Sequence, residues 1–137
     1  MAGGLASVDA MLFHGTDTAI GKFRCPVGHP QFRDSGPIQR QIVVFPRSSV
    51  WITFEGRPSF VADPNVVTIY NRDQRYVRDV LSPEGDRCDW FAVSDHMARE
   101  IAATFEPAAA DRAARPFRFE RAPVTPALYL RQRRLAR

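Results

Sequence analysis

Histidine, cysteine and lysine are scarce in this sequence. Among 137 residues there are three histidines, two cysteines and a single lysine, Lys22. The histidines, His14, His29 and His96, form no HxH, HExxH or HxD/E pattern, so the clustered ligands of a metal-dependent dioxygenase or isomerase are missing. The sequence also lacks a G-x-S-x-G motif, a Walker loop and a dinucleotide-binding fingerprint. These absences predict a protein that catalyses no reaction.

Long apolar runs are also missing, and none approaches the roughly 20 residues that span a membrane. The segment from Met1 to Phe13 has neither a basic start nor a continuous apolar stretch, so it does not look like a secretory signal. Two cysteines are too few for a disulfide scaffold. We therefore expect a cytoplasmic protein that makes no membrane contact.

The charge balance is only mildly basic, with a formal net charge of +4. Charge alone allows a stand-alone nucleic-acid binder as one alternative. The arginines are scattered, however, and a single basic run stands at the end of the chain: Arg131, Arg133, Arg134 and Arg137. We interpret this run as the solvated face of a helix.

Short extended segments separated by turn residues fill the sequence as far as Val93. They are rich in Val, Ile, Phe, Thr, Tyr and Trp, which suit a pleated sheet. Strands this short and this evenly spaced predict one mainly β domain, a sandwich or a barrel. The predicted strands are Met11–His14, Ala19–Phe23, Gln41–Pro46, Val50–Phe54, Ser59–Ala62, Val66–Tyr70, Arg75–Val80 and Arg87–Val93.

One long irregular segment, Cys25 to Ile38, interrupts this pattern. It is rich in proline and glycine, and Phe32 is its one large apolar residue. A loop of this length in a small domain is usually functional or is held down by something.

Helical patterns begin after Val93. Ser94 or Asp95 can cap a helix in which Met97, Ile101 and Phe105 recur every four residues and form one apolar stripe.

A second helix is predicted to start where Thr125 precedes Pro126, a favoured pair for the cap and the first turn. Leu128 and Leu135 lie seven residues apart on one face of it. The two helices carry more apolar surface than a barrel must cover, which predicts a homodimer through them. No residue that ends helices precedes Arg137, so we expect the chain to be part of a longer protein.

Three residues form a candidate metal site. Cys25 and His29 are separated by three residues, so that one turn can present two ligands, and Cys88 would supply a third from a distant strand. Two thiolates and an imidazole suit zinc, here in a structural role. The alternative is two buried cysteines and a loop histidine bonded to the backbone. The fourth zinc ligand is left open among Asp86, Asp89, His96 and water.

Several blocks of sequence resemble the N-terminal domain of AraC-type transcription regulators. The resemblance runs from about Phe13 to Val93 and resumes near Pro116–Leu135. The blocks that carry it are Phe23–Phe32, Val44–Arg47, Val61–Asn71, Gln74–Arg78 and Gly85–Trp90.

This resemblance implies a cupin-like jelly-roll barrel that senses a small-molecule effector, followed by one or two helices that mediate dimerisation. We place the barrel at residues 1–93 and the helical connector at residues 94–137. The family's DNA-binding domain with its helix-turn-helix motifs is absent from this chain, so DNA would be bound only through that missing part.

Effector-binding residues are expected in the barrel interior, where a pocket is mostly apolar with a few aimed polar groups. Aromatic walls would come from Trp51, Tyr70, Tyr76 and Trp90, whereas Arg40 or Arg78 would bind a carboxylate. Plain core packing is the alternative for each aromatic residue. The alternative function is a metal-dependent cupin enzyme for a small acid or sugar, with a catalytic metal held by Cys25, His29 and Cys88.

Overall fold

The computed structural model describes residues 9–105, 117 and 120–136 of the chain. This part contains nine strands and two helices. The strands are β1 (Asp9–His14), β2 (Thr18–Cys25), β3 (Gln41–Pro46), β4 (Val50–Phe54), β5 (Phe60–Ala62), β6 (Val66–Tyr70), β7 (Tyr76–Val80), β8 (Asp86–Val93) and β9 (Arg121–Pro123); the helices are α1 (Asp95–Phe105) and α2 (Pro126–Leu135).

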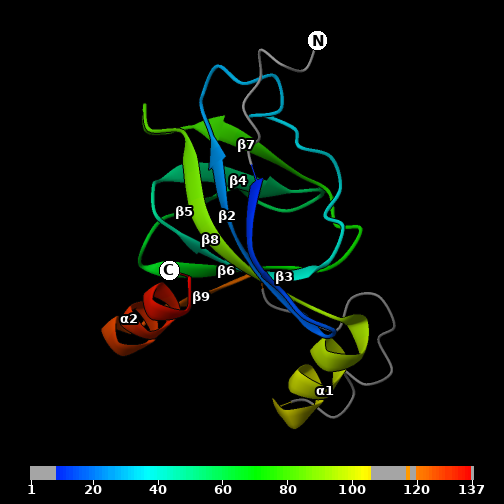
Figure 1. The fold of residues 1–137 in the computed structure, drawn as a ribbon. Coiled ribbons are helices and arrows are strands. Elements are labelled where there is room, and N and C mark those ends of the chain that lie inside the picture. Colours follow the sequence, from blue (N-terminus) through cyan, green and yellow to red (C-terminus); the bar gives the residue numbers. More distant parts are fainter. Residues whose placement is uncertain (1–8, 106–116, 118–119, 137) are drawn as a thin grey trace.

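Two antiparallel sheets form the body of the domain (Figure 1). The larger sheet has six strands in the order β1-β2-β8-β3-β6-β9, and the smaller has three in the order β5-β4-β7. Strands far apart in the sequence therefore lie side by side, as β2 and β3 both do with β8. In Figure 1 both helices project from the same end of the body, on opposite sides of it.

The core lies between the sheets because alternate residues of each strand point inward. In β4, Val50, Ile52 and Phe54 are each no more than 2% exposed, whereas Trp51 between them is 39% exposed. Edge-to-face contacts join Phe54 to Tyr70 and Tyr76.

All eight predicted strands are confirmed, each to within two residues at either end. The ninth, β9, was not predicted. It has three residues, two of them Ala122 and Pro123, and it pairs with the edge of β6. The segment after Val93 is thus not helical throughout, because it returns a strand to the larger sheet.

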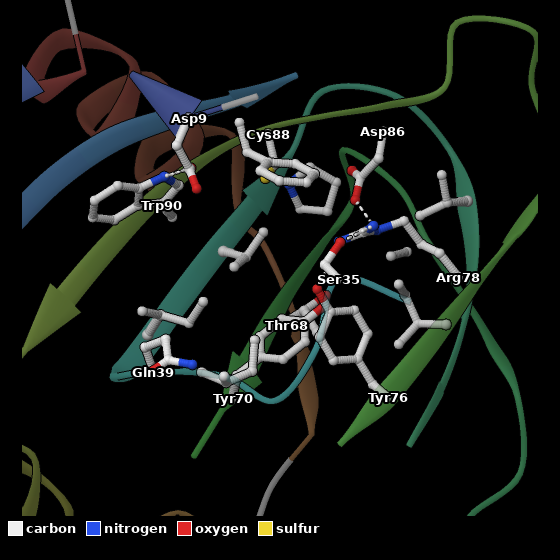
Figure 2. A pocket seen from close by; sticks show the side chains of 18 of the residues that line it. Asp9, Ser35, Gln39, Thr68, Tyr70, Tyr76, Arg78, Asp86, Cys88 and Trp90 are labelled. Atoms are coloured by element: carbon white, nitrogen blue, oxygen red, sulfur yellow. Dashed lines mark hydrogen bonds and ion pairs between the residues drawn. The ribbon is translucent and has the colours of Figure 1, made fainter. Parts of the chain in front are cut away.

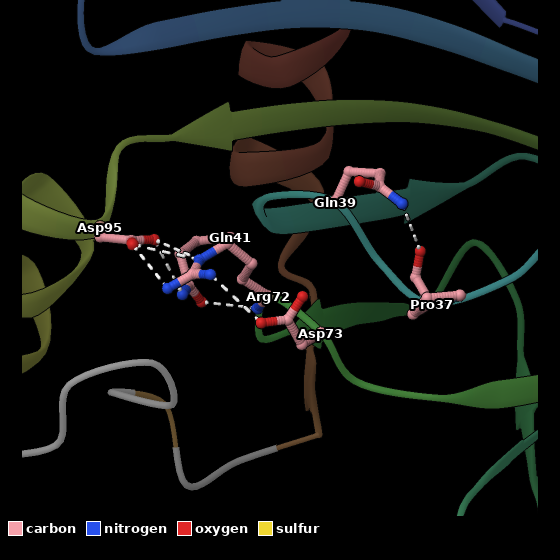
Figure 3. Close-up of polar contacts among 6 residues, drawn as sticks. All are labelled: Pro37, Gln39, Gln41, Arg72, Asp73 and Asp95. Atoms are coloured by element: carbon pink, nitrogen blue, oxygen red, sulfur yellow. Dashed lines mark hydrogen bonds and ion pairs between the residues drawn. The ribbon is translucent and has the colours of Figure 1, made fainter.

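The start of α1 is tied to the sheet by a polar network (Figure 3). Ser94 caps the helix, and its Oγ accepts a hydrogen bond from the Met97 amide at 3.1 Å. Asp95 accepts hydrogen bonds from Arg72 Nε at 3.1 and 3.2 Å and from Gln41 Nε2 at 3.2 Å. The hydrogen bond from Arg72 is the largest effect on the pKa of Asp95 and lowers it, so this carboxylate stays charged. It holds the start of α1 beside Gln41, at the start of β3.

Helix α2 is attached differently. Thr125 caps it as predicted, accepting from the Leu128 amide at 3.2 Å, with Pro126 in the first turn. On its inner side Arg133 Nη1 lies 3.6 Å from the carboxylate of Asp89, which is fully buried on β8. The prediction of a purely solvated basic face is therefore wrong for Arg133, because the helix turns this residue towards a buried charge.

No helix in the part of the chain that the structure describes is long and apolar enough to cross a membrane.

Two glycines in left-handed turns allow a stability prediction with an internal control. Gly85 and Gly56 have φ angles of 74° and 76°, so alanine is strained at both by a similar amount. A Cβ at Gly85 would also lie 2.4 Å from the Cys25 carbonyl oxygen, whereas a Cβ at Gly56 would meet nothing within 4 Å.

We predict that Gly56→Ala lowers the free energy of unfolding by about 1–2 kcal/mol and that Gly85→Ala lowers it further. Urea unfolding measures both values. Equal losses would contradict the close approach of the turn before β8 to the end of β2.

Candidate functional site

A cavity of about 410 Å³ lies between the two sheets. Most of its wall is apolar, with side chains from both sheets and from the loop after β2. The lining residues are Asp9, Met11, Phe23, Ser35, Gly36, Pro37, Ile38, Gln39, Arg40, Ile42, Val44, Pro46, Val50, Ile52, Ala62, Thr68, Tyr70, Tyr76, Arg78, Asp86, Cys88 and Trp90.

Arg78 on β7 is the most connected polar residue of this wall, and only 3% of it is exposed (Figure 2). Its Nη1 donates to the carbonyl oxygen of Phe32 at 2.7 Å and to Ser35 Oγ at 2.8 Å. Its Nη2 donates to the Tyr76 hydroxyl at 2.6 Å. The guanidinium also lies over the ring of Phe23, with 4.8 Å to the centroid. Both terminal nitrogens of Arg78 are thus already hydrogen-bonded within the protein.

The partner of its charge is Asp86, at the start of β8, whose Oδ2 lies 2.6 Å from Arg78 Nε. Burial raises the pKa of Asp86, and the opposing attraction of Arg78 does not cancel this effect. A buried ion pair of this kind is costly to form and more costly to break, because each charge would remain buried alone.

The same arginine pins the loop between β2 and β3 against the barrel. Its side chain also donates to the Gln31 carbonyl at 3.4 Å, and the Arg78 amide donates to the Arg33 carbonyl at 2.8 Å. Phe32 is only 4% exposed and packs in the core, as its place in the sequence predicted. The far end of the loop is held by Ile38, which exchanges backbone bonds with Gln74 and Asp73. The loop therefore forms a fixed side of the cavity.

Thr68 supplies an unsatisfied polar group to the wall. It lies two residues before Tyr70 on β6, so both side chains point to the inner side of the sheet. Its side chain is 0% exposed, and its Oγ1 has no hydrogen-bond partner among the described residues. Burial raises the pKa of Tyr70 well above its usual value and that of Tyr76 to about 12, so both hydroxyls stay protonated.

A third polar group lies apart from the Arg78–Asp86 pair (Figure 2). Trp90 Nε1 donates to Asp9 Oδ1 at 3.0 Å, and the Arg40 guanidinium lies 6.0 Å from the Trp90 ring centroid. Burial raises the pKa of Asp9, while Trp90 and Arg40 lower it.

The structure brings together most of the residues predicted to bind the effector. Arg40, Tyr70, Arg78 and Trp90 line the cavity, and so does Tyr76. The prediction for Trp51 is wrong, because alternation along β4 turns its ring to the outer surface. Thr68 was not predicted, although its place in the alternating run before Tyr70 could have identified it.

The three candidate zinc ligands are not assembled into a site. No group of three His, Cys, Asp or Glu residues suited to a metal occurs among the residues that the structure describes. Cys25 and Cys88 lie buried on adjacent strands, and burial raises the pKa of both thiols and disfavours the thiolates that zinc requires. His29 lies in the loop, where its Nδ1 accepts from the Gln31 amide at 3.1 Å. The geometry therefore offers zinc no ligand set here.

No family model and no curated protein matches this sequence. Among solved structures, the chain is similar to the cupin domain of Cnp3 from Schizosaccharomyces pombe, with 16% identity, a TM-score of 0.52 and coverage of 68% of each chain. It is also similar to a variant of apo ToxT from Vibrio cholerae, with 8% identity and a TM-score of 0.58 over 90% of this chain and 48% of that one. The chain thus spans about half the length of ToxT. These likenesses show the fold, which is a cupin-like jelly roll followed by two helices, as predicted.

We predict that Arg78→Met lowers the free energy of unfolding by about 3–5 kcal/mol, because it leaves Asp86 buried without a partner. The double variant with Asp86→Leu should recover part of this loss. Urea unfolding of each variant provides the measurement.

Arg33→Met is the matched control. Arg33 pairs with Asp79 at the surface, where both side chains are at least half exposed. This change should cost less than about 1 kcal/mol. If Arg78→Met were as mild as Arg33→Met, the buried pair would not be what holds the loop.

Proposed function

We propose that this chain is the effector-sensing and dimerising domain of an AraC-type transcription regulator, which binds a small molecule without converting it. The observation that carries the proposal is the cavity of about 410 Å³ inside the barrel. Its size and its largely apolar wall with a few placed polar groups are typical of a small-molecule site.

The regulator assignment rests on two supports. The sequence blocks described above resemble the AraC-type N-terminal domain. The fold is also similar to that of ToxT, an AraC-family regulator, over 90% of this chain. In this proposal the DNA-binding half belongs to a part of the regulator outside this chain, and the location is cytoplasmic.

Binding rather than catalysis is favoured by the chemistry of the wall. None of the three histidines, His14, His29 and His96, is among the residues that line the cavity. The charged groups Arg78 and Asp86 pair with each other, and Asp9 accepts from Trp90. Groups held in this way recognise a ligand by its shape and by a small number of hydrogen bonds.

A cavity-filling variant tests the proposal. Ala62 lines the cavity and is 4% exposed, whereas Val61 beside it on β5 does not line it. The protein is screened against a panel of small metabolites by thermal unfolding, since a ligand at a hundredfold its Kd stabilises the fold by about 2.7 kcal/mol. We expect at least one compound to raise the Tm, and Ala62→Trp but not Val61→Trp to abolish the shift.

The same compound should alter operator occupancy when the chain is joined to a DNA-binding domain that binds only as a dimer. Chemical conversion of the compound by the purified protein would contradict the proposal, and so would a Tm shift that survives Ala62→Trp.

Dimerisation through the helices is the second part of the proposal. On α2, Leu128 and Leu135 are 42% and 59% exposed, and Ile101 on α1 is 44% exposed. Apolar side chains exposed at this level on neighbouring turns are typical of a partner surface. The side chain of Phe105, which belongs to the predicted stripe on α1, lies outside the described residues.

We predict a dimer in sedimentation at micromolar concentration, and a monomer after Leu128→Glu with Leu135→Glu. Leu81→Glu is the control, because Leu81 is 45% exposed but follows β7, away from the helices. A monomeric wild-type chain, or a dimer that the helix variant leaves intact, would rule out this interface.

A further inference from the structure

The charged groups of the cavity wall balance one another. Two arginines, Arg40 and Arg78, and two carboxylates, Asp9 and Asp86, line it. Arg78 and Asp86 form an ion pair at 2.6 Å, and Asp9 accepts from Trp90 at 3.0 Å. A charged ligand would therefore meet a wall with no net charge, and one that bound to Arg78 or Asp86 would have to break their ion pair. An uncharged ligand incurs neither cost.

Arg78 in particular is not available to an anion. Its Nη1 donates to Phe32 and Ser35, its Nη2 to Tyr76, and its Nε faces Asp86. A carboxylate or phosphate bound to this guanidinium would release the loop that carries Phe32 and Ser35. Of the two arginines predicted to bind a carboxylate, Arg40 and Arg78, the second is thus committed to contacts within the protein.

Thr68 has a buried hydroxyl without a hydrogen-bond partner among the described residues, and unlike Arg78 Nε, which faces Asp86, it has no ion pair either. A buried hydroxyl without a hydrogen bond costs about 1–3 kcal/mol relative to a satisfied one. Its Oγ1 has none among the described residues, and its side chain is on the inner face of β6, beside Tyr70 and opposite Val44 of β3. A ligand that brings one hydroxyl or carbonyl to this position would remove the cost.

The rest of the wall is suited to a ring. Aromatic side chains line the cavity together with branched aliphatic ones, and aromatic rings favour stacked or edge-on contacts with one another. The aromatic members are Phe23, Tyr70, Tyr76 and Trp90, and the aliphatic members include Ile42, Val44, Val50 and Ile52. A sugar would leave most of its hydroxyls unpaired against such a surface.

We propose that the effector is an uncharged, mainly apolar small molecule with an aromatic ring and a single hydroxyl or carbonyl, which hydrogen-bonds Thr68 Oγ1. This inference rests on the proposed function, because it names the chemistry of the molecule that the cavity would sense. Thr68 then selects the ligand's polar group, and the charge-balanced wall excludes its ionised analogues.

Three probes that share an ethylbenzene body separate the chemical features: 4-ethylphenol, ethylbenzene and 4-ethylbenzoate. Calorimetry at neutral pH should show that 4-ethylphenol binds most tightly, that ethylbenzene binds more weakly, and that the anion 4-ethylbenzoate does not bind. Thr68→Val keeps the shape of the side chain and removes its hydroxyl. This variant should weaken the binding of 4-ethylphenol at least tenfold and leave the affinity for ethylbenzene unchanged.

Two controls accompany this variant. Thr68→Ser should retain binding of 4-ethylphenol, because it retains the hydroxyl. Thr53→Val should change nothing, since Thr53 does not line the cavity and its hydroxyl is paired with Ser59. In the absence of ligand, Thr68→Val should unfold at the same urea concentration as the wild type or a higher one, because it removes an unsatisfied buried group.

The remaining outcomes separate this proposal from the proposed function. Tighter binding of 4-ethylbenzoate than of 4-ethylphenol would overturn the ligand class while leaving a sensing cavity in place. An unchanged affinity of 4-ethylphenol for Thr68→Val would overturn the role of Thr68. Failure of all three probes would also overturn the ligand class, whereas the proposed function has separate tests: the metabolite panel with Ala62→Trp, and the absence of chemical conversion.

Discussion

A single buried arginine decides the shape of the cavity. Arg78 joins β7 to β8 through Asp86 and joins both to the loop after β2 through Phe32 and Ser35. Without it, the middle of that loop would be held to the core by the side chain of Phe32, and its end by Ile38. The attraction between the two charges adds little to the stability of the fold, because burial raises the pKa of Asp86 in spite of the arginine beside it. What the pair provides is geometry, since few other side chains can donate in several fixed directions at once.

The fold was largely predictable from the sequence because its strands carry both of the signals that a strand can have. Runs such as Val50–Phe54 combine β-branched and aromatic residues with alternating burial, and turn residues separate them. β9 has neither signal. Its residues are Arg121, Ala122 and Pro123, and it is a strand only because the edge of β6 offers unpaired backbone groups at that place. A strand that forms only because a neighbouring strand pairs with it cannot be predicted from its own residues.

The site was predictable in its composition but not in its bonding. Residue type and strand pattern placed Tyr70, Tyr76, Arg78 and Trp90 near one another, and the cavity contains them all. Burial alternates along the whole of β4, and the inward prediction for Trp51 rests on its residue type alone, whereas its neighbours Val50 and Ile52 take the inner face. The sequence predicts that a zinc ion holds the loop from Cys25 to Ile38, whereas in the structure Arg78 holds this loop. A long loop shows that something must restrain it, but spacing alone does not say whether that is a metal or a guanidinium.

Strand β8 lies between the cavity and the last helix, because one of its faces lines the cavity and the other contacts α2. Asp86, Cys88 and Trp90 line the cavity, whereas Asp89 faces the side of α2. The contact with α2 is the least satisfied polar contact in the described part of the chain. Asp89 and Gln132 contribute four of the six buried side-chain atoms that lack a hydrogen-bond partner there, and the nearest arginine nitrogens are 3.6 and 3.8 Å from Asp89. The charge of Asp89 is nevertheless paired with Arg47 and with Arg133, so the ion pair from Arg133 joins α2 to β8. A molecule in the cavity would touch the same strand through Trp90 and Cys88, so the cavity and α2 share β8 as a common support.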